Sequence, residues 1–179
     1  MNRIICVMLL GVVFAISGTV FAEDNVNLLK NSELKLDSKG QLPNWETWVK
    51  CKFTQDAGHK GQNSVRMTLE AGDDVNANSR IVLYQTIDNL KPGKYILSAN
   101  IKVDRRILSL ALFKISKVKG ETDYDGKEVS VEPEEWTNVT REVNIPEGIT
   151  SASFAFSFID APGATIWVDS PVVSYNGKQ

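Results

Sequence analysis

Beyond residue 23, apolar and polar residues alternate with a period of two, which is typical of strands that have one face in a core. The alternation is clearest at residues 65–69, 95–103 and 139–145. In residues 152–158 it puts three phenylalanines on one face and small residues on the other, and we expect the small face to form the floor of a groove. No stretch of helical period follows residue 23, so the pattern predicts an all-β fold.

Turns that contain glycine or proline separate these predicted strands, notably at residues 91–93, 146–148 and 161–163. Proline presets the turn angle, and glycine accepts the positive φ that the following position often requires. About eight to ten short strands without intervening helices favour a two-sheet antiparallel β-sandwich. The longest polar interval, residues 116–135, is too long for a tight turn and is predicted to be a loop.

The first 22 residues have the features of a signal peptide. Arg3 is followed by an apolar run over residues 4–16 and by the small-x-small triplet of residues 20–22. Such a run is too short for a stable membrane span. We therefore expect cleavage after residue 22, one domain over residues 23–179, and a periplasmic or extracellular location with no integral membrane span. A retained membrane anchor is the alternative.

Charge and reactive residues exclude several functions. The formal net charge is −2 and there is no basic tract, so nucleic acid is not an expected partner. After cleavage Cys51 would be the only cysteine, which excludes an internal disulfide, and its alternation with Val49 and Phe53 predicts a buried thiol. His59 is the only histidine, and no GxSxG or HExxH motif is present. The sequence therefore predicts a protein that is not an enzyme.

Aromatic residues on polar strand faces indicate carbohydrate binding. Trp48 alternates with the apolar positions on either side of it and so shares a polar face with Glu46 and Lys50. An indole stacks on the apolar face of a pyranose ring, while amides and guanidinium groups bind its hydroxyls. The predicted carbohydrate-binding residues are Trp48, Tyr84, Tyr124, Arg66, Gln85 and Asn100. The alternatives are edge packing for the aromatic residues and a solvated outer face for the polar ones.

Five segments together resemble the carbohydrate-binding modules of families 4, 9 and 22. They are residues 27–48, 58–69, 83–103, 136–156 and 164–177. The resemblance implies a jelly-roll sandwich of the galactose-binding-like group, with a glycan bound in a cleft across the concave sheet. It therefore groups Trp48 with Arg66 and Asn100.

The same resemblance assigns roles to three other tryptophans. Trp45 and Trp136 match positions that these modules fill with a structural tryptophan, so both are expected in the core. Trp167 takes the place of the aromatic residue in the terminal strand and is also expected to be structural.

The resemblance also raises the question of calcium, which modules of this kind often hold between the first and last strands through oxygen ligands. Asp169 matches the terminal aspartate of the pattern. Lys35, however, stands where the motif over residues 31–35 normally ends in glutamate. Our hypothesis is that a Lys35–Asp169 salt bridge replaces the ion. No cofactor is therefore expected, with a structural calcium as the alternative.

Two functions remain after these considerations. The first is a secreted, non-catalytic protein that binds a glycan by aromatic stacking and a few hydrogen bonds. The second keeps the sandwich but uses it to contact proteins in an extracellular or envelope assembly, with no sugar ligand. Aromatic residues that line a groove beside polar groups favour the first, and a flat apolar patch favours the second.

Overall fold

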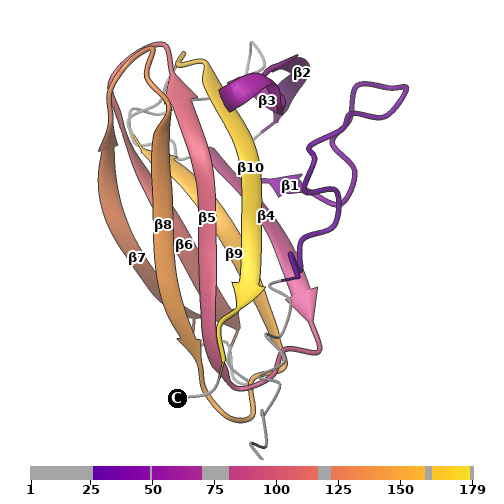
Figure 1. Cartoon of the computed structure of the whole chain (residues 1–179), viewed down its shortest axis with the longest axis vertical. Coiled ribbons are helices and arrows are strands. Elements are labelled where there is room, and N and C mark those ends of the chain that lie inside the picture. The colour runs from indigo at the N-terminus through magenta and orange to yellow at the C-terminus, as the bar shows by residue number, and fades with distance from the viewer. Residues whose placement is uncertain (1–25, 49, 70–80, 117–121, 160–162, 178–179) are drawn as a thin grey trace, which may run out of the picture.

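The structure is a computed structural model that describes residues 26–48, 50–69, 81–116, 122–159 and 163–177. The predicted signal peptide lies outside these residues. The described strands form two antiparallel sheets (Figure 1). They are β1 (Glu46–Thr47), β2 (Cys51–Ala57), β3 (Asn63–Leu69), β4 (Ile81–Asp88), β5 (Gly93–Val103), β6 (Ile107–Ser116), β7 (Thr122–Val131), β8 (Thr137–Ile145), β9 (Ser151–Ile159) and β10 (Ile166–Tyr175), with a short 3-10 helix over His59–Gly61.

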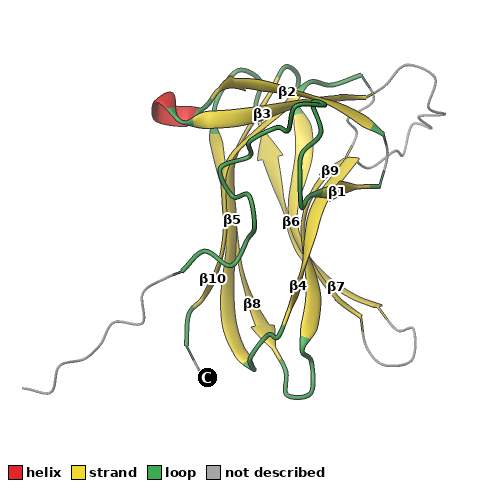
Figure 2. Cartoon of the chain, turned by 90° about the vertical axis from the view of Figure 1, so that its right-hand side faces the viewer, coloured by secondary structure: helices red, strands yellow, loops and turns green. Residues whose placement is uncertain are grey.

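Sheet A has the strand order β1-β4-β9-β6-β7, and sheet B has the order β2-β3-β10-β5-β8. The two sheets lie face to face (Figure 2). Consecutive strands lie in opposite sheets, except in the hairpins β2-β3 and β6-β7. This crossing pattern is that of a jelly-roll sandwich, as the sequence predicted. Among the residues that the structure describes, no helix has the length and apolar character needed to cross a membrane.

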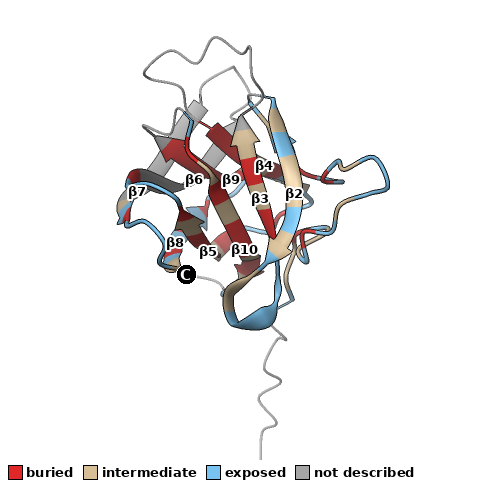
Figure 3. Ribbon diagram, turned by 90° about the horizontal axis from the view of Figure 1, so that it is seen from above, coloured by how far each residue is buried: buried red, intermediate tan, exposed pale blue. Residues whose placement is uncertain are grey.

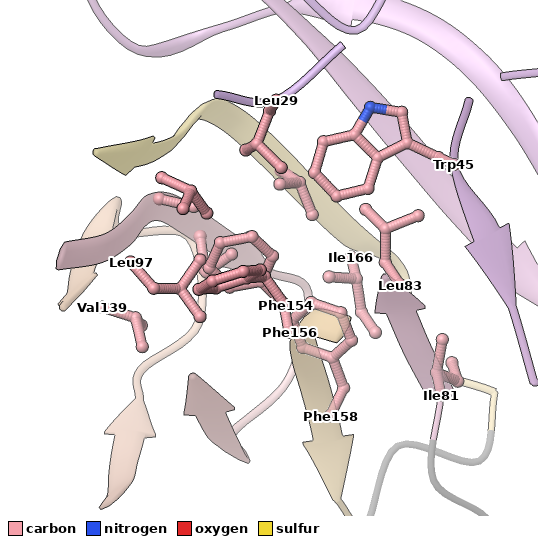
Figure 4. Packing of buried hydrophobic residues seen from close by; sticks show 14 of the residues in the cluster. Leu29, Trp45, Ile81, Leu83, Leu97, Val139, Phe154, Phe156, Phe158 and Ile166 are labelled. Atoms are coloured by element: carbon pink, nitrogen blue, oxygen red, sulfur yellow. The ribbon is translucent and has the colours of Figure 1, made fainter. Parts of the chain in front are cut away.

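The core lies between the sheets and is built by the predicted alternation. Phe154, Phe156 and Phe158 of β9 are fully buried and face sheet B, where they meet Leu97 and Ile166 (Figure 4). Buried and partly exposed residues alternate along the whole of β5, and the buried inner positions are visible from above in Figure 3. Complete burial of each phenyl ring contributes about 1.5–3 kcal/mol, which makes the inner face of β9 a major source of stability.

Two sequence predictions about local structure are wrong. The alternation around Trp48 predicted one continuous strand, but β1 belongs to sheet A and β2 to sheet B. The chain therefore changes sheets just after Trp48. Residues 116–135 were expected to form a loop, whereas Thr122–Val131 forms strand β7, which pairs with β6. Cys51 is partly buried and packs against the core.

Candidate functional site

Trp48 stands on the outer face of sheet A, at the end of its edge strand. Its backbone N–H donates to the carbonyl of Val82 at 3.3 Å, which continues the pairing of β1 with β4. Trp48 is 48% exposed, an unusual value for a tryptophan in a sandwich of this size. Trp48 and Val26 are the large apolar side chains that stand exposed among the described residues. Trp48 therefore presents an aromatic surface to solvent, as predicted.

Tyr84 is on the same face, two residues along β4 from Val82, the residue that Trp48 pairs with. Glu46 and Tyr84 are directly opposite each other in the ladder, and the tyrosine hydroxyl donates to Glu46 Oε2 at 2.6 Å. That hydrogen bond to a carboxylate, together with partial burial, raises the pKa of the Tyr84 hydroxyl. Diagonal neighbours in an antiparallel pair are about 7–8 Å apart, so Trp48 and Tyr84 form one aromatic edge to this face.

The surface beside these aromatic residues carries small and hydroxyl-bearing side chains, as the alternation of residues 152–158 predicted, and that it forms the floor of a groove stays a prediction. Val82 and Ala155 are buried and pack with Tyr84 in a small cluster that is separate from the main core. Further along the strands, Thr86 Oγ1 and Ser153 Oγ are hydrogen-bonded at 2.9 Å. The accessible part of this face therefore consists of the aromatic residues and, beyond them, the hydroxyl pair, which suits a ring with an apolar face and polar edges.

Ser157 is the one described side-chain hydroxyl on this face that is buried without a hydrogen-bond partner. It pairs with Val82 in the ladder and is therefore in the row that ends at Trp48. Burying an unpaired hydroxyl costs free energy, so Ser157 lowers the stability of the folded protein.

Two of the predicted residues on sheet A are placed differently from expectation. Gln85 faces the interior, with 5% of its surface exposed, and its amide both accepts from the Lys30 N–H at 2.7 Å and donates to the Lys30 carbonyl at 3.0 Å. It fastens the N-terminal segment to β4 and does not belong to the outer face. Tyr124 lies in β7 opposite Lys114, rather than in a loop, and its side chain is outside the described part.

Arg66 and Asn100 are on sheet B, so grouping them with Trp48 in one cleft is wrong. Arg66 alternates with the buried residues of β3, and Asn100 with those of β5, and both point away from the core. The two sheets of a sandwich are about 10 Å apart between their mean planes, and the core fills the space between them. A ligand on Trp48 therefore does not reach Arg66 or Asn100.

The outer face of sheet B carries Trp136 and Trp167, of which Trp136 was expected in the core. Trp45 is buried in the core as expected, but Trp136 is only partly buried and lies outside it. The Lys102 ammonium lies 5.6 Å from the centre of the Trp136 ring and 4.5 Å from that of Trp167. Trp167 Nε1 donates to Asp56 Oδ2 at 2.9 Å. The alternation of β5 and β10 already put Lys102 and Trp167 on outer faces, and only the register brings them together.

Carbohydrate-binding modules are among the solved structures with the same architecture. TmCBM61, solved in complex with β-1,4-galactotriose, superposes with a TM-score of 0.61 at 18% identity, covering 84% of this chain and 99% of that one. The CBM22-1 xylan-binding domain of Paenibacillus barcinonensis Xyn10C gives a TM-score of 0.64 at 14% identity, covering 87% and 97%. This chain has the fold of a carbohydrate-binding module.

The module fold also occurs within larger chains. The enzymatically active domain of bacteriophage CBA120 tailspike protein 4 matches with a TM-score of 0.59 at 15% identity, covering 83% of this chain but only 21% of the tailspike chain. No family model and no curated protein sequence matches this chain.

The residues around Asp169 do not fit the calcium that a module fold of this kind suggests. Asp169 is 1% exposed, and its carboxylate accepts from the His59 N–H at 2.6 Å and from the Ser170 hydroxyl at 2.7 Å. Calcium takes six to eight oxygen ligands, often from several carboxylates. Within the described ranges, no three His, Cys, Asp or Glu side chains gather as a metal site.

Our Lys35–Asp169 salt bridge is also wrong. Lys35 pairs with Glu33 instead, although Lys35 and Asp169 line the same open pocket. The buried carboxylate is therefore satisfied by a backbone N–H and a hydroxyl rather than by an ammonium group.

Proposed function

We propose that this protein is a secreted, non-catalytic carbohydrate-binding protein whose ligand site is the outer face of sheet A. Trp48 stacks against a pyranose ring, and Tyr84 with its bound Glu46 provides the next contact. The observation that carries the proposal is the 48% exposed tryptophan beside a face of small residues. The export that residues 1–22 predict would bring the protein to periplasmic or extracellular glycans.

The chemistry of this face supports a sugar more than a flat protein contact. Tyr84, which is partly exposed above the buried Val82 and Ala155, offers an apolar ring surface to the axial C–H groups of a pyranose. The hydroxyl pair of Thr86 and Ser153 is placed to exchange hydrogen bonds with the hydroxyls of the next ring. A protein-binding face would be expected to present a larger continuous apolar patch.

The described carboxylates on this face support binding without hydrolysis. Glu46 is opposite Tyr84, and Asp88, which accepts from the Ser151 hydroxyl, is four residues further along β4. Four residues of strand span about 13 Å. A glycosidase needs two carboxyl groups about 5–9.5 Å apart on either side of the scissile bond, which this spacing does not provide.

The test is titration of the purified chain with xylan and β-1,4-galactan, the polysaccharide classes suggested by the two modules, followed by a wider glycan array. Trp48→Ala is expected to weaken binding at least about tenfold, because the stacked indole supplies most of the apolar contact. Tyr84→Phe keeps the ring and removes only the hydroxyl, so a smaller loss is expected.

Two results would count against the proposal. The first is a Trp48→Ala variant that is folded and binds as tightly as the native chain, because the site would then be elsewhere. The second is a native chain that binds no polysaccharide on the array. That result would favour the alternative function, contact with a protein partner through Trp48, which cross-linking at position 48 would detect.

A further inference from the structure

A row of cations and indoles crosses the outer face of sheet B. In the ladder, Arg66 of β3 is opposite Trp167 of β10, and Trp167 is opposite Lys102 of β5. Trp136, just before β8, completes the row on the far side of Lys102. We call these four residues the indole–cation row. It lies on the side of the sandwich opposite Trp48 and takes no part in the function proposed above.

The two cations of the row differ in their partners. Arg66 Nη1 is 3.9 Å from Asp56 Oδ2. The other oxygen of Asp56 accepts from the Ala57 N–H at 2.8 Å, so both oxygens of this carboxylate are engaged. No described carboxylate lies within ion-pair distance of Lys102, whose ammonium instead lies over two indole rings. The row therefore carries one ammonium group that makes no close ion pair, although its charge helps to lower the pKa of the Asp56 carboxyl.

The positions next to the row present hydrogen-bonding groups. Asn138 Nδ2 donates to Asn100 Oδ1 at 3.1 Å, and Thr140 Oγ1 donates to Asn138 Oδ1 at 2.5 Å. Asn100 is on the same face of β5 as Lys102, two residues away, which is about 7 Å along a strand. A ligand held at Lys102 would therefore meet the amides first and then the Thr140 hydroxyl, which is opposite Ser98 and about 13 Å along the strand, so it would have to extend over more than one sugar ring.

We propose that the indole–cation row is a second binding surface, and that it binds acidic sugars through their carboxylate or sulfate group. The anionic group pairs with the Lys102 ammonium, the indoles of Trp136 and Trp167 form apolar walls on either side, and Asn138 with Thr140 binds ring hydroxyls. A cation that lies between two aromatic rings is only partly hydrated, so an incoming anion displaces less water than at an exposed lysine.

Affinity electrophoresis of the purified chain tests this surface with polygalacturonate and with its fully methyl-esterified form. The two polymers share a backbone and differ in charge. Dextran sulfate and dextran form a second pair that distinguishes sulfate from carboxylate recognition. We expect retardation by at least one charged polymer, and little by either neutral one, because the ion pair with Lys102 dominates.

Matched variants test whether Lys102 is responsible for binding the charged polymers. Lys102→Met keeps an unbranched apolar stem between the indoles and is expected to weaken binding at least tenfold, whereas Lys102→Arg retains most of it. Lys94→Met is the control, because Lys94 is on the same strand and face but is paired with Glu142 at 3.1 Å. Trp48→Ala, on the other sheet, is expected to leave polyanion binding within twofold of the native value.

Three outcomes would overturn the proposal, each distinct from failure of the Trp48 site. The first is a native chain that neither charged polymer retards. The second is an equal loss in Lys102→Met and Lys94→Met, which would mean diffuse attraction. The third is Lys102→Met binding unchanged while circular dichroism shows the native fold. None of these bears on whether Trp48→Ala abolishes binding to neutral polysaccharides.

Discussion

The two outer faces of this sandwich both carry tryptophan, but they use it in opposite ways. On sheet A, Trp48 is 48% exposed and is held by its backbone, with its ring presented to solvent. On sheet B, Trp167 donates its indole N–H to Asp56 and lies beneath the Lys102 ammonium. The first indole is available to a ligand, while the second is already part of an internal network.

This difference sets what each face can bind. A neutral sugar that stacks on Trp48 displaces only water, whereas one that stacks on Trp167 must also displace the Lys102 ammonium from the ring. An anion on sheet B has no such cost, because it adds a partner to Lys102 without removing one. The two faces therefore differ in how exposed their indoles are and in what those indoles already contact, rather than in the number of aromatic residues.

The largest predicted effect comes from Asp169→Ala, which removes the hydrogen bonds of a buried carboxylate on β10 of sheet B. The substitution leaves the His59 N–H without its acceptor and removes one of the two acceptors of the Ser170 hydroxyl, the other being Gln62 Oε1. We expect a loss of about 2–3 kcal/mol in the free energy of unfolding, measured in urea, because these are hydrogen bonds to a buried charge. Binding at the Trp48 face should persist in the folded fraction.

Asp88→Ala on sheet A is the control for that substitution. Asp88 is exposed and accepts from the Ser151 hydroxyl at 2.6 Å, so its removal is expected to cost no more than about 0.5 kcal/mol. Equal losses of unfolding free energy in the two variants would show that the two faces depend equally on their hydrogen bonds, contrary to the comparison. Calcium-dependent stability of the native chain would show that Asp169 has a ligand beyond His59 and Ser170.

Most of the fold could be predicted from the sequence, because it depends on local alternation. The phenylalanines of β9 are buried, as their spacing predicted, and the serine and alanine side is turned outward. Tyr84 and Thr86 are on the outer face of β4, a placement that alternation left open because Val82 and Gln85 fit either face. A period of two reports which side of a strand a residue is on, whatever sheet the strand joins.

Alternation does not report which sheet a strand joins, and the candidate site depended on that. A single unbroken pattern runs past Trp48 although the chain passes from sheet A to sheet B there. Nothing in the pattern therefore separated Trp48 from Arg66, and the resemblance grouped them in one cleft. Gln85 was misjudged because its partner, the backbone of Lys30, is 55 residues away in sequence. The contact of Lys102 with Trp136 likewise depends on the pairing of β5 with β8.

A matched pair of conservative substitutions gives the next largest effect. Trp167→Phe removes the donor to Asp56 and reduces the ring beneath Lys102, so we expect a loss of about 1–1.5 kcal/mol in unfolding free energy. Trp48→Phe removes an indole that makes no described side-chain hydrogen bond and is expected to change stability by less than about 0.5 kcal/mol. Thermal unfolding of both variants measures the difference, and a reversed order would refute the distinction between the faces.

The smallest effect, and the most specific to sheet B, is the pH dependence of Asp56→Asn. The indole N–H of Trp167, the Ala57 N–H and the nearby Arg66 lower the pKa of the Asp56 carboxyl below its usual 3.8. A carboxyl whose pKa is lower in the folded state stabilises the protein above its unfolded pKa, and this stability is lost as pH falls through the folded value.

At pH 7 we expect the native chain to be more stable than Asp56→Asn by only about 0.5 kcal/mol, since asparagine keeps an acceptor and the site is half-exposed. The difference should be lost at an acid pH below the folded pKa of Asp56, and it should already be smaller at pH 7 in a Trp167→Phe background, where the main cause of the shift is gone. Urea unfolding of the four proteins at both pH values measures this coupling. A gap that is independent of pH and of Trp167 would mean that the Asp56 charge does not support the indole, and that the two outer faces differ only in exposure.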